Sequence, residues 1–123
     1  MAKRILLVDD EQETRDVFNA ALKSGGFEVV IAVNGKETLD ILNTQKFDLV
    51  LLDQMMPDMS GNETLKSLKA NPNSADTKVA MLTNFGHDDM IKEALNAGAV
   101  DYILKYQVSG EDLIKKVKLI MGN

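Results

Sequence analysis

The chain has 123 residues, of which 45% are hydrophobic, the usual share for one globular domain with a buried core. Its formal net charge of −5 argues against direct binding of nucleic acid or of an anionic membrane surface, because both repel an acidic protein. With no cysteine and one histidine, the composition excludes disulfides, thiolate metal sites and the usual zinc sites, whereas a hard cation bound by oxygen is compatible with it. No apolar run suits a signal peptide or a membrane span, so we expect a cytoplasmic protein.

The first part of the chain predicts two strands and two helices. Residues 4–8 form a short continuous apolar run, typical of a strand that is buried on both faces. Apolar residues then repeat with helical spacing until a glycine pair ends the pattern. This stripe consists of Thr14, Val17, Phe18, Ala21 and Leu22, and the glycines are Gly25 and Gly26. Residues 28–33 suit a strand nearer the sheet edge, and Asn34 with Glu37 has the spacing of a helix cap and its partner.

The remainder repeats the alternation of strand and helix. Strands are predicted at 49–52, 79–82 and 102–104. The helices between and after them are marked by the capping pairs Ser60 with Glu63 and Ser109 with Asp112, by the stripe Ile91, Ala94 and Leu95 before Gly98, and by the final stripe Leu113, Val117, Ile120 and Met121. Strict alternation of this kind predicts an α/β fold in which helices cover both faces of a parallel sheet.

Residues 5–12 read ILLVDDEQ, so three consecutive acids follow the first predicted strand. Asp10 or Glu11 could begin the next helix, because acids complement the positive end of the helix dipole. Adjacent like charges at a buried strand end also repel one another, and this repulsion indicates a nearby cation. The stretch alone leaves helix capping and a metal or phosphate site equally open.

Polar residues also follow the third, fourth and fifth predicted strands. Asp53 follows the third strand, Thr83 the fourth and Lys105 the fifth, and the carboxyl ends of parallel strands share one edge of the sheet. We therefore expect these side chains to meet Asp9 and Asp10. Clustered carboxylates suit Mg²⁺, and a carboxylate can attack a phosphoryl group when cations neutralise its oxygens.

Four stretches of the sequence, VDDE, LLDQMMPDMSG, MLTN and GAVDYILK, resemble the receiver domain of bacterial two-component response regulators, the CheY-like family. Residues 53–61 fit the family signature D-x-x-M-P-x-M-x-G, which is a specific match. The resemblance covers essentially the whole of 1–123. It implies a single flavodoxin-like, doubly wound domain with five helices and a five-stranded parallel sheet in the order 2-1-3-4-5.

The resemblance also implies a role for each residue of the expected site. Asp53 would accept a phosphoryl group from a histidine kinase, a histidine phosphotransfer protein or a small phosphodonor. Asp10 and Asp53 would bind Mg²⁺ directly, Asp9 would bind it through water, and the backbone carbonyl of Met55 would be a further ligand. Lys105 would pair with the phosphoryl oxygens.

A two-state switch is implied in addition. Thr83 would move to hydrogen-bond the new phosphoryl oxygen, and Tyr102 resembles the aromatic residue that turns inward when that hydroxyl moves. The surface of the fourth helix, the fifth strand and the fifth helix would change for a downstream effector protein. The domain would not be an enzyme but a phosphoacceptor that assists its own phosphorylation and dephosphorylation.

Two features depart from the family pattern or narrow the site. Tyr106 follows Lys105 where the family usually has a proline, often in a cis peptide; a cis bond before another residue costs about 2.5 to 4 kcal/mol, so we expect trans. Met55 and Phe85 are apolar and flank the expected path of attacking water, which predicts slow dephosphorylation.

The main alternative is a phosphorylation-independent interaction module with a receiver fold. Tyr106 and Asn84 leave this alternative open, whereas the intact set of acids and Lys105 opposes it. A flavin-binding electron carrier has the same alternation, but residues 9–11 would repel its phosphate. The sequence encodes no output domain, so the chain either acts through separate partners or is one domain of a longer regulator.

Overall fold

The computed structural model describes residues 2–122. The elements in chain order are β1 (Arg4–Val8), α1 (Gln12–Ser24), β2 (Glu28–Ala32), α2 (Gly35–Thr44), β3 (Leu49–Leu52), α3 (Gly61–Ala70), β4 (Val79–Thr83), α4 (Asp88–Asn96), β5 (Asp101–Leu104), a 3₁₀ turn at Lys105–Gln107 and α5 (Gly110–Met121). The five strands are parallel and lie in the order β2-β1-β3-β4-β5. The predicted fold class and strand order are therefore confirmed.

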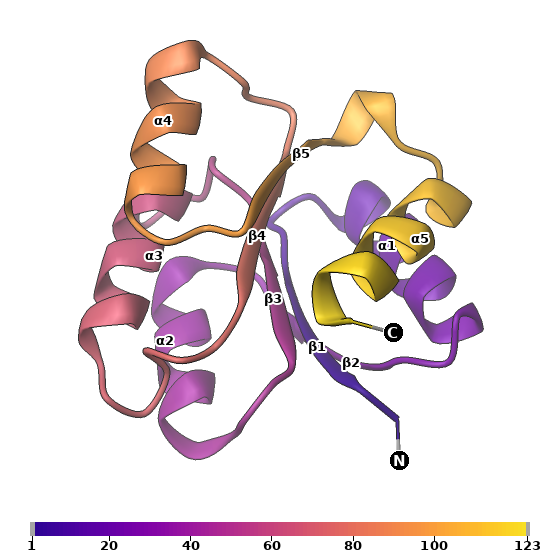
Figure 1. The fold of residues 1–123 in the computed structure, drawn as a ribbon, viewed down its shortest axis with the longest axis horizontal. Coiled ribbons are helices and arrows are strands. Elements are labelled where there is room, and N and C mark those ends of the chain that lie inside the picture. The colour runs from indigo at the N-terminus through magenta and orange to yellow at the C-terminus, as the bar shows by residue number, and fades with distance from the viewer. Residues whose placement is uncertain (1, 123) are drawn as a thin grey trace.

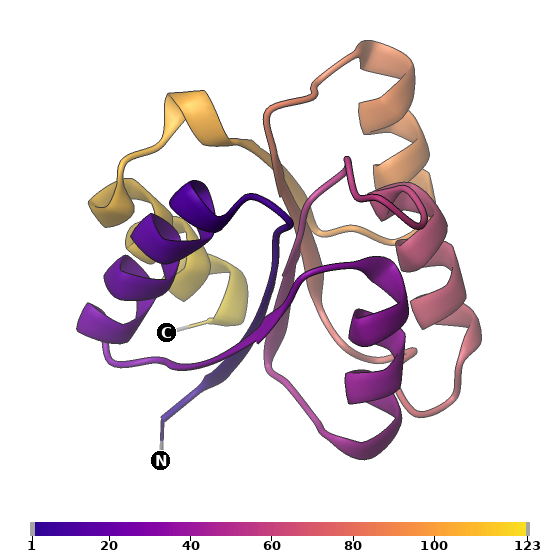
Figure 2. The same cartoon turned by 180° about the vertical axis from the view of Figure 1, so that it is seen from behind.

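The helices form two layers, one on each face of the sheet. Figure 1 shows α2, α3 and α4 to the left of the sheet and α1 and α5 to its right, and Figure 2 shows the same layers from behind. Successive strand residues point to opposite faces. Ile5 and Leu7 accordingly pack with the α1/α5 layer, whereas Leu6 and Val8 pack with the α2–α4 layer.

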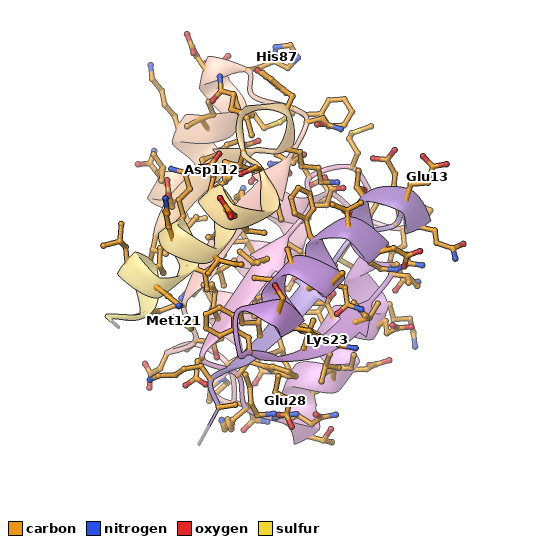
Figure 3. The ribbon with its side chains drawn as sticks, turned by 90° about the vertical axis from the view of Figure 1, so that its right-hand side faces the viewer. Glu13, Lys23, Glu28, His87, Asp112 and Met121 are labelled. Carbon is orange, nitrogen blue, oxygen red and sulfur yellow. The ribbon has the colours of Figure 1, made fainter. Side chains whose placement is uncertain are left out.

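The helices run antiparallel to the strands, so their N-termini lie near the carboxyl ends of the strands. Figure 3 shows this for the α1/α5 layer: Glu13 and Asp112, in the first turns, lie toward the end that carries His87, and Lys23 and Met121 lie toward Glu28 at the opposite end. This arrangement places helix N-termini and strand ends around the same edge of the sheet. None of the helices in the described part of the chain is long and apolar enough to cross a membrane.

The predicted helix starts have a clear chemical basis. Ser60 and Ser109 each form a capping box, in which the serine accepts the N–H of the acid three residues later and that acid accepts the serine N–H. The side chain of Asn34 accepts the Glu37 N–H at the start of α2. After α1, Gly26 has φ +92°, a conformation that glycine adopts without a steric penalty.

The predicted apolar stripes were wrong at two residues. Val17 is 61% exposed and Leu95 is 47% exposed, although both were expected on buried helix faces. The buried rows are Phe18 with Leu22 in α1 and Ala94 in α4. Each exposed residue is one position away in sequence from a buried residue. One position is a rotation of about 100° around the helix axis, which turns the side chain away from the sheet. Strand ends differ from the prediction by one residue at β2, β4 and β5.

Candidate functional site

The structure brings together the polar residues that follow β1, β3, β4 and β5. Val8 pairs with Leu52 and Thr83 pairs with Leu104, so the strands end nearly level. The Asp53 N–H donates to the carbonyl of Val8 at 3.1 Å. Carboxylate oxygens of Asp9, Asp10 and Asp53 lie within 4.8 Å of one another. This spacing allows the three acids to bind a single metal ion.

Lys105 lies between two buried carboxylates of this cluster. Its Nζ is 2.6 Å from Oδ2 of Asp9 and 3.0 Å from Oδ2 of Asp53, and Glu11 lies farther away at 3.8 Å. Asp9, Asp53 and Lys105 are all buried, whereas Asp10 and Glu11 are exposed. One ammonium faces more carboxylates than it can neutralise, so the arrangement favours a further cation.

Burial and mutual attraction shift the pKa values of Asp53 and Lys105. Burial raises the pKa of the Asp53 carboxyl, and hydrogen bonding to Thr83 and the charge of Lys105 offset only part of this rise. Burial works against the charge on Lys105, but the hydrogen bond to Asp9 and the negative charge of Asp53 outweigh it, so the pKa of Lys105 is raised. A cation near Asp53 would lower the cost of its negative charge.

The hydrogen bonds of the acidic stretch help to decide between helix capping and a cation site. Glu11 occupies the N-cap position of α1, but within the described residues its side chain makes no capping hydrogen bond. Asp9 instead accepts the Glu11 N–H at 2.9 Å and the Thr14 hydroxyl at 3.1 Å. Oδ2 of Asp9 also lies 2.6 Å from Nζ of Lys105, and the carboxylate oxygens of Asp9 and Asp10 lie within 4.8 Å of those of Asp53, an arrangement that favours a cation site over capping.

The loop that follows β3 is fixed by hydrogen bonds to Asp53 and to the start of α2, and by close packing at Gly61. Oδ1 of Asp53 accepts the N–H of Gln54 at 2.7 Å and that of Met55 at 3.4 Å. At Gly61, a Cβ atom would lie 2.3 Å from the carbonyl oxygen of Asp53, so only glycine allows this approach. Asp58 accepts the N–H groups of Gly35 and Lys36 at 3.0 and 2.8 Å, which ties the loop to α2.

A pocket of about 230 Å³ opens beside Asp53. It is lined by Asp10, Glu11, Asp53, Met55, Asn84 and Phe85. The side chains of Met55 and Phe85 are 52% and 39% exposed at its rim. The two apolar residues therefore lie along the solvent path to Asp53.

Thr83 and Tyr102 hold the loop between β4 and α4 from two directions. Thr83 is fully buried, and its hydroxyl oxygen accepts the Phe85 N–H at 3.3 Å. The hydroxyl of Tyr102 donates to the Phe85 carbonyl, and the half-buried ring packs against the α2–α4 core. Burial raises the pKa of Tyr102.

Residues 2–122 contain no cis peptide bond, so the expected trans bond before Tyr106 is confirmed.

Two buried residues next to this site were missed by the sequence analysis. Gln54 and Asn62 are 2% and 4% exposed; Nε2 of Gln54 donates to Oδ1 of Asn62, and the backbone N–H of Asn62 donates to Oε1 of Gln54. Asn62 could have been found by extending the buried row of Leu65 and Leu68 back toward the start of α3, which predicts an inward-facing amide. For Gln54, which follows directly after a buried strand, the sequence offers no comparable signal.

Comparisons with known proteins agree with this architecture. The family model of the response regulator receiver domain matches residues 5–118. The phosphate regulon transcriptional regulatory protein PhoB of Pseudomonas aeruginosa is 36% identical over 121 residues, which are 98% of this chain and 52% of PhoB. The sporulation initiation phosphotransferase F of Bacillus subtilis is 36% identical over 105 residues, which are 85% of this chain and 83% of that protein.

Solved structures show the same fold. A CheY-like response regulator receiver domain protein from Methanospirillum hungatei superposes with a TM-score of 0.92 at 34% identity, covering 99% of this chain and 95% of the other. The chemotaxis response regulator CheY4 of Vibrio cholerae gives a TM-score of 0.89 at 28% identity, covering 98% and 99%. This chain belongs to the response regulator receiver family, the phosphoacceptor domains of two-component signalling. It spans about half the length of the PhoB proteins that it matches.

Proposed function

We propose that Asp53 is the phosphoacceptor and that Mg²⁺ is required for its phosphorylation. The observation that carries this proposal is the position of Asp53, between the Lys105 ammonium at 3.0 Å and the open pocket lined by Asp10. Asp9, Asp10 and Asp53 would hold the ion, with the Met55 carbonyl as a further ligand. When bound, the ion supplies positive charge against the phosphoryl oxygens.

The chain's own residues account for the transfer. A carboxylate oxygen of Asp53 attacks phosphorus, the bond to the donor nitrogen or oxygen breaks, and the leaving group departs with that electron pair. Lys105, already between Asp9 and Asp53, pairs with the phosphoryl oxygens. The Thr83 hydroxyl donates to one of these oxygens. The domain thus assists its own phosphorylation and dephosphorylation without acting on a separate substrate.

The Thr83 hydroxyl also links phosphorylation of Asp53 to the surface formed by α4, β5 and α5. If Thr83 turns toward the phosphoryl group, the Phe85 N–H loses its acceptor and the loop before α4 shifts, with Tyr102 following the Phe85 carbonyl. The surface formed by α4, β5 and α5 would then present a changed face to a downstream effector protein. The phosphoryl donor would be a histidine kinase or a histidine phosphotransfer protein in the cytoplasm.

Phosphorylation can be measured directly by intact mass spectrometry after incubation with acetyl phosphate and Mg²⁺. We expect a mass gain of one phosphoryl group in the wild-type chain and in Asp89→Asn, which changes an exposed acid in α4. Asp53→Asn, and the wild-type chain in excess chelator, should show no gain. A folded wild-type chain that shows no gain would contradict the proposal and favour the phosphorylation-independent interaction module.

A further inference from the structure

Gln54 and Asn62 form a buried pair of side-chain amides beside Tyr102. The backbone N–H of Asn62 donates to Oε1 of Gln54 at 2.7 Å. Because an N–H can only donate, the atom of Gln54 that faces it must be the amide oxygen. This bond orients the Gln54 amide so that its Nε2 faces the other way. Nε2 donates to Oδ1 of Asn62 at 2.9 Å and to the Tyr102 hydroxyl at 3.3 Å.

The Tyr102 hydroxyl is consequently held by two partners in the protein. It donates to the carbonyl of Phe85 and accepts from Nε2 of Gln54. Its ring packs against the α2–α4 core rather than projecting into solvent. An outward rotamer would exchange both hydrogen bonds for bonds to water and would leave Nε2 of Gln54 with one partner fewer in a buried position.

The amide pair also reaches α4. Nδ2 of Asn62 donates to the carbonyl of Met90 at 3.2 Å and to Oε1 of Glu93 at 3.1 Å. A continuous hydrogen-bonded chain therefore runs from the residue directly after Asp53 to Tyr102 on β5 and to α4. These elements belong to the surface that the proposed function assigns to the downstream partner.

We propose that Gln54 is a positioning residue of the switch, which holds Tyr102 inward and so raises the population of the arrangement that phosphorylation favours. The inference rests on the proposed function for the meaning of the inward position. The hydrogen bond from Nε2 stabilises only the inward rotamer, so it shifts the balance between the two rotamers at every level of phosphorylation. Gln54 thereby raises the fraction of the unphosphorylated domain that already has the arrangement favoured by phosphorylation.

The test compares two nearly isosteric substitutions. Gln54→Met keeps the length of the side chain but removes its donor. Asn62→Leu removes the partner amide but keeps the backbone N–H of residue 62, which still orients Oε1 of Gln54. A role in packing alone predicts that both variants disturb Tyr102, whereas a positioning role predicts that only Gln54→Met does so.

Tyr102 can be observed by ¹⁹F NMR of 3-fluorotyrosine, because the chain has two tyrosines. Tyr106 is 69% exposed, and its signal can be assigned with Tyr106→Phe. In the unphosphorylated protein, Gln54→Met should lower the ratio of inward to outward Tyr102 about five-fold, the equivalent of one net hydrogen bond. The solvent isotope shift of the Tyr102 signal should rise accordingly, and beryllofluoride, a phosphoryl mimic, should reverse the change. Asn62→Leu should keep the wild-type signal.

A Tyr102 signal that is the same in Gln54→Met and the wild type would overturn the inference, as would an equal shift in Asn62→Leu. If Gln54→Met does not fold, the double variant Gln54→Met/Asn62→Leu removes both amides together, and it should show the shift of Tyr102 that Gln54→Met predicts. The measurement on unphosphorylated protein does not depend on phosphorylation. Failure of acetyl phosphate labelling would therefore count against the proposed function and not against this inference.

Discussion

Lys105 lies closer to Asp9 than to Asp53, with Nζ distances of 2.6 and 3.0 Å to the two Oδ2 atoms. The lysine thus neutralises a proposed metal ligand and the proposed phosphoacceptor together. The other oxygen of Asp53, Oδ1, is turned toward the N–H groups of the following loop. The resting site is consequently organised by one buried cation shared between two acids.

Removal of the Lys105 ammonium should destabilise the fold, and Mg²⁺ should restore part of the lost stability. We expect Lys105→Met to lower the free energy of unfolding by about 3 kcal/mol, because it leaves two buried carboxylates uncompensated. Mg²⁺ should stabilise this variant more than the wild type, since it replaces the missing charge. Urea unfolding with and without Mg²⁺ measures both effects, with Lys116→Met on the exposed face of α5 as the control. Equal stabilisation of wild type and variant by Mg²⁺ would argue against a shared site.

Asp10 is the exposed acid of the cluster, so it can be neutralised with little effect on the core. Asp10→Asn should leave the stability without metal unchanged or slightly raised, because it removes repulsion from neighbouring carboxylates. In the wild type, Mg²⁺ at ten times its dissociation constant should add about 1.4 kcal/mol to the free energy of unfolding. Thermal unfolding with increasing Mg²⁺ should show this gain in the wild type and in Asp16→Asn, but not in Asp10→Asn.

The apolar rim of the pocket should control the lifetime of the phosphoryl group. Met55 and Phe85 line the approach to Asp53 and offer an attacking water no hydrogen-bond partner. Replacement of both by polar side chains, Met55→Asn with Phe85→Gln, should accelerate dephosphorylation roughly five-fold, the rate equivalent of one net hydrogen bond. Phosphate release is measured in Mg²⁺ after removal of the donor. The apolar control, Met55→Leu with Phe85→Leu, should keep the slow rate, and equal rates in both double variants would refute the idea.

Asp58 provides a test that depends on pH. The N–H groups of Gly35 and Lys36 lower the pKa of its carboxyl in the folded state. The stabilisation by Asp58 is therefore fully present above the unfolded-state pKa of about 3.9 and is lost as the pH falls through the lower folded-state value. At neutral pH, Asp58→Ala should destabilise the fold by about 1 kcal/mol, as the loss of a helix cap does.

Urea unfolding of the wild type and Asp58→Ala at several pH values separates this contribution from other effects of acid. The difference between the two proteins should be constant from neutral pH to about pH 5 and should shrink at lower pH. A difference that is the same at every pH would show that the charge of Asp58 does not support α2.

The fold could be predicted closely because its determinants are local in sequence. Apolar runs such as Leu49–Leu52 mark buried strands, and the serines that begin α3 and α5 mark helix starts by their own side-chain chemistry. The meeting of Asp9, Asp53 and Lys105 followed from one property of parallel sheets, the shared edge at which the strands end.

The residues that escaped prediction depend on three-dimensional packing. Val17 and Leu95 follow the helical spacing of their stripes, but each lies about 100° around the helix axis from the buried row and is exposed. Gln54 is buried because the Asn62 amide and the Tyr102 hydroxyl satisfy its polar atoms. Neither partner is adjacent to Gln54 in the sequence, so its burial could not be inferred from local pattern.

The sheet separates the interior into two apolar clusters, one beneath α1 and α5 and the other beneath α2, α3 and α4. Because strand side chains alternate between the clusters, a substitution such as Leu7→Val changes one of them and leaves Leu6 in the other in place. Substitutions in opposite clusters that lie more than about 7–10 Å apart and share no contacts combine additively. Natural variation or protein engineering can therefore remodel the packing beneath α1 and α5 while the packing beneath α2, α3 and α4 keeps its shape.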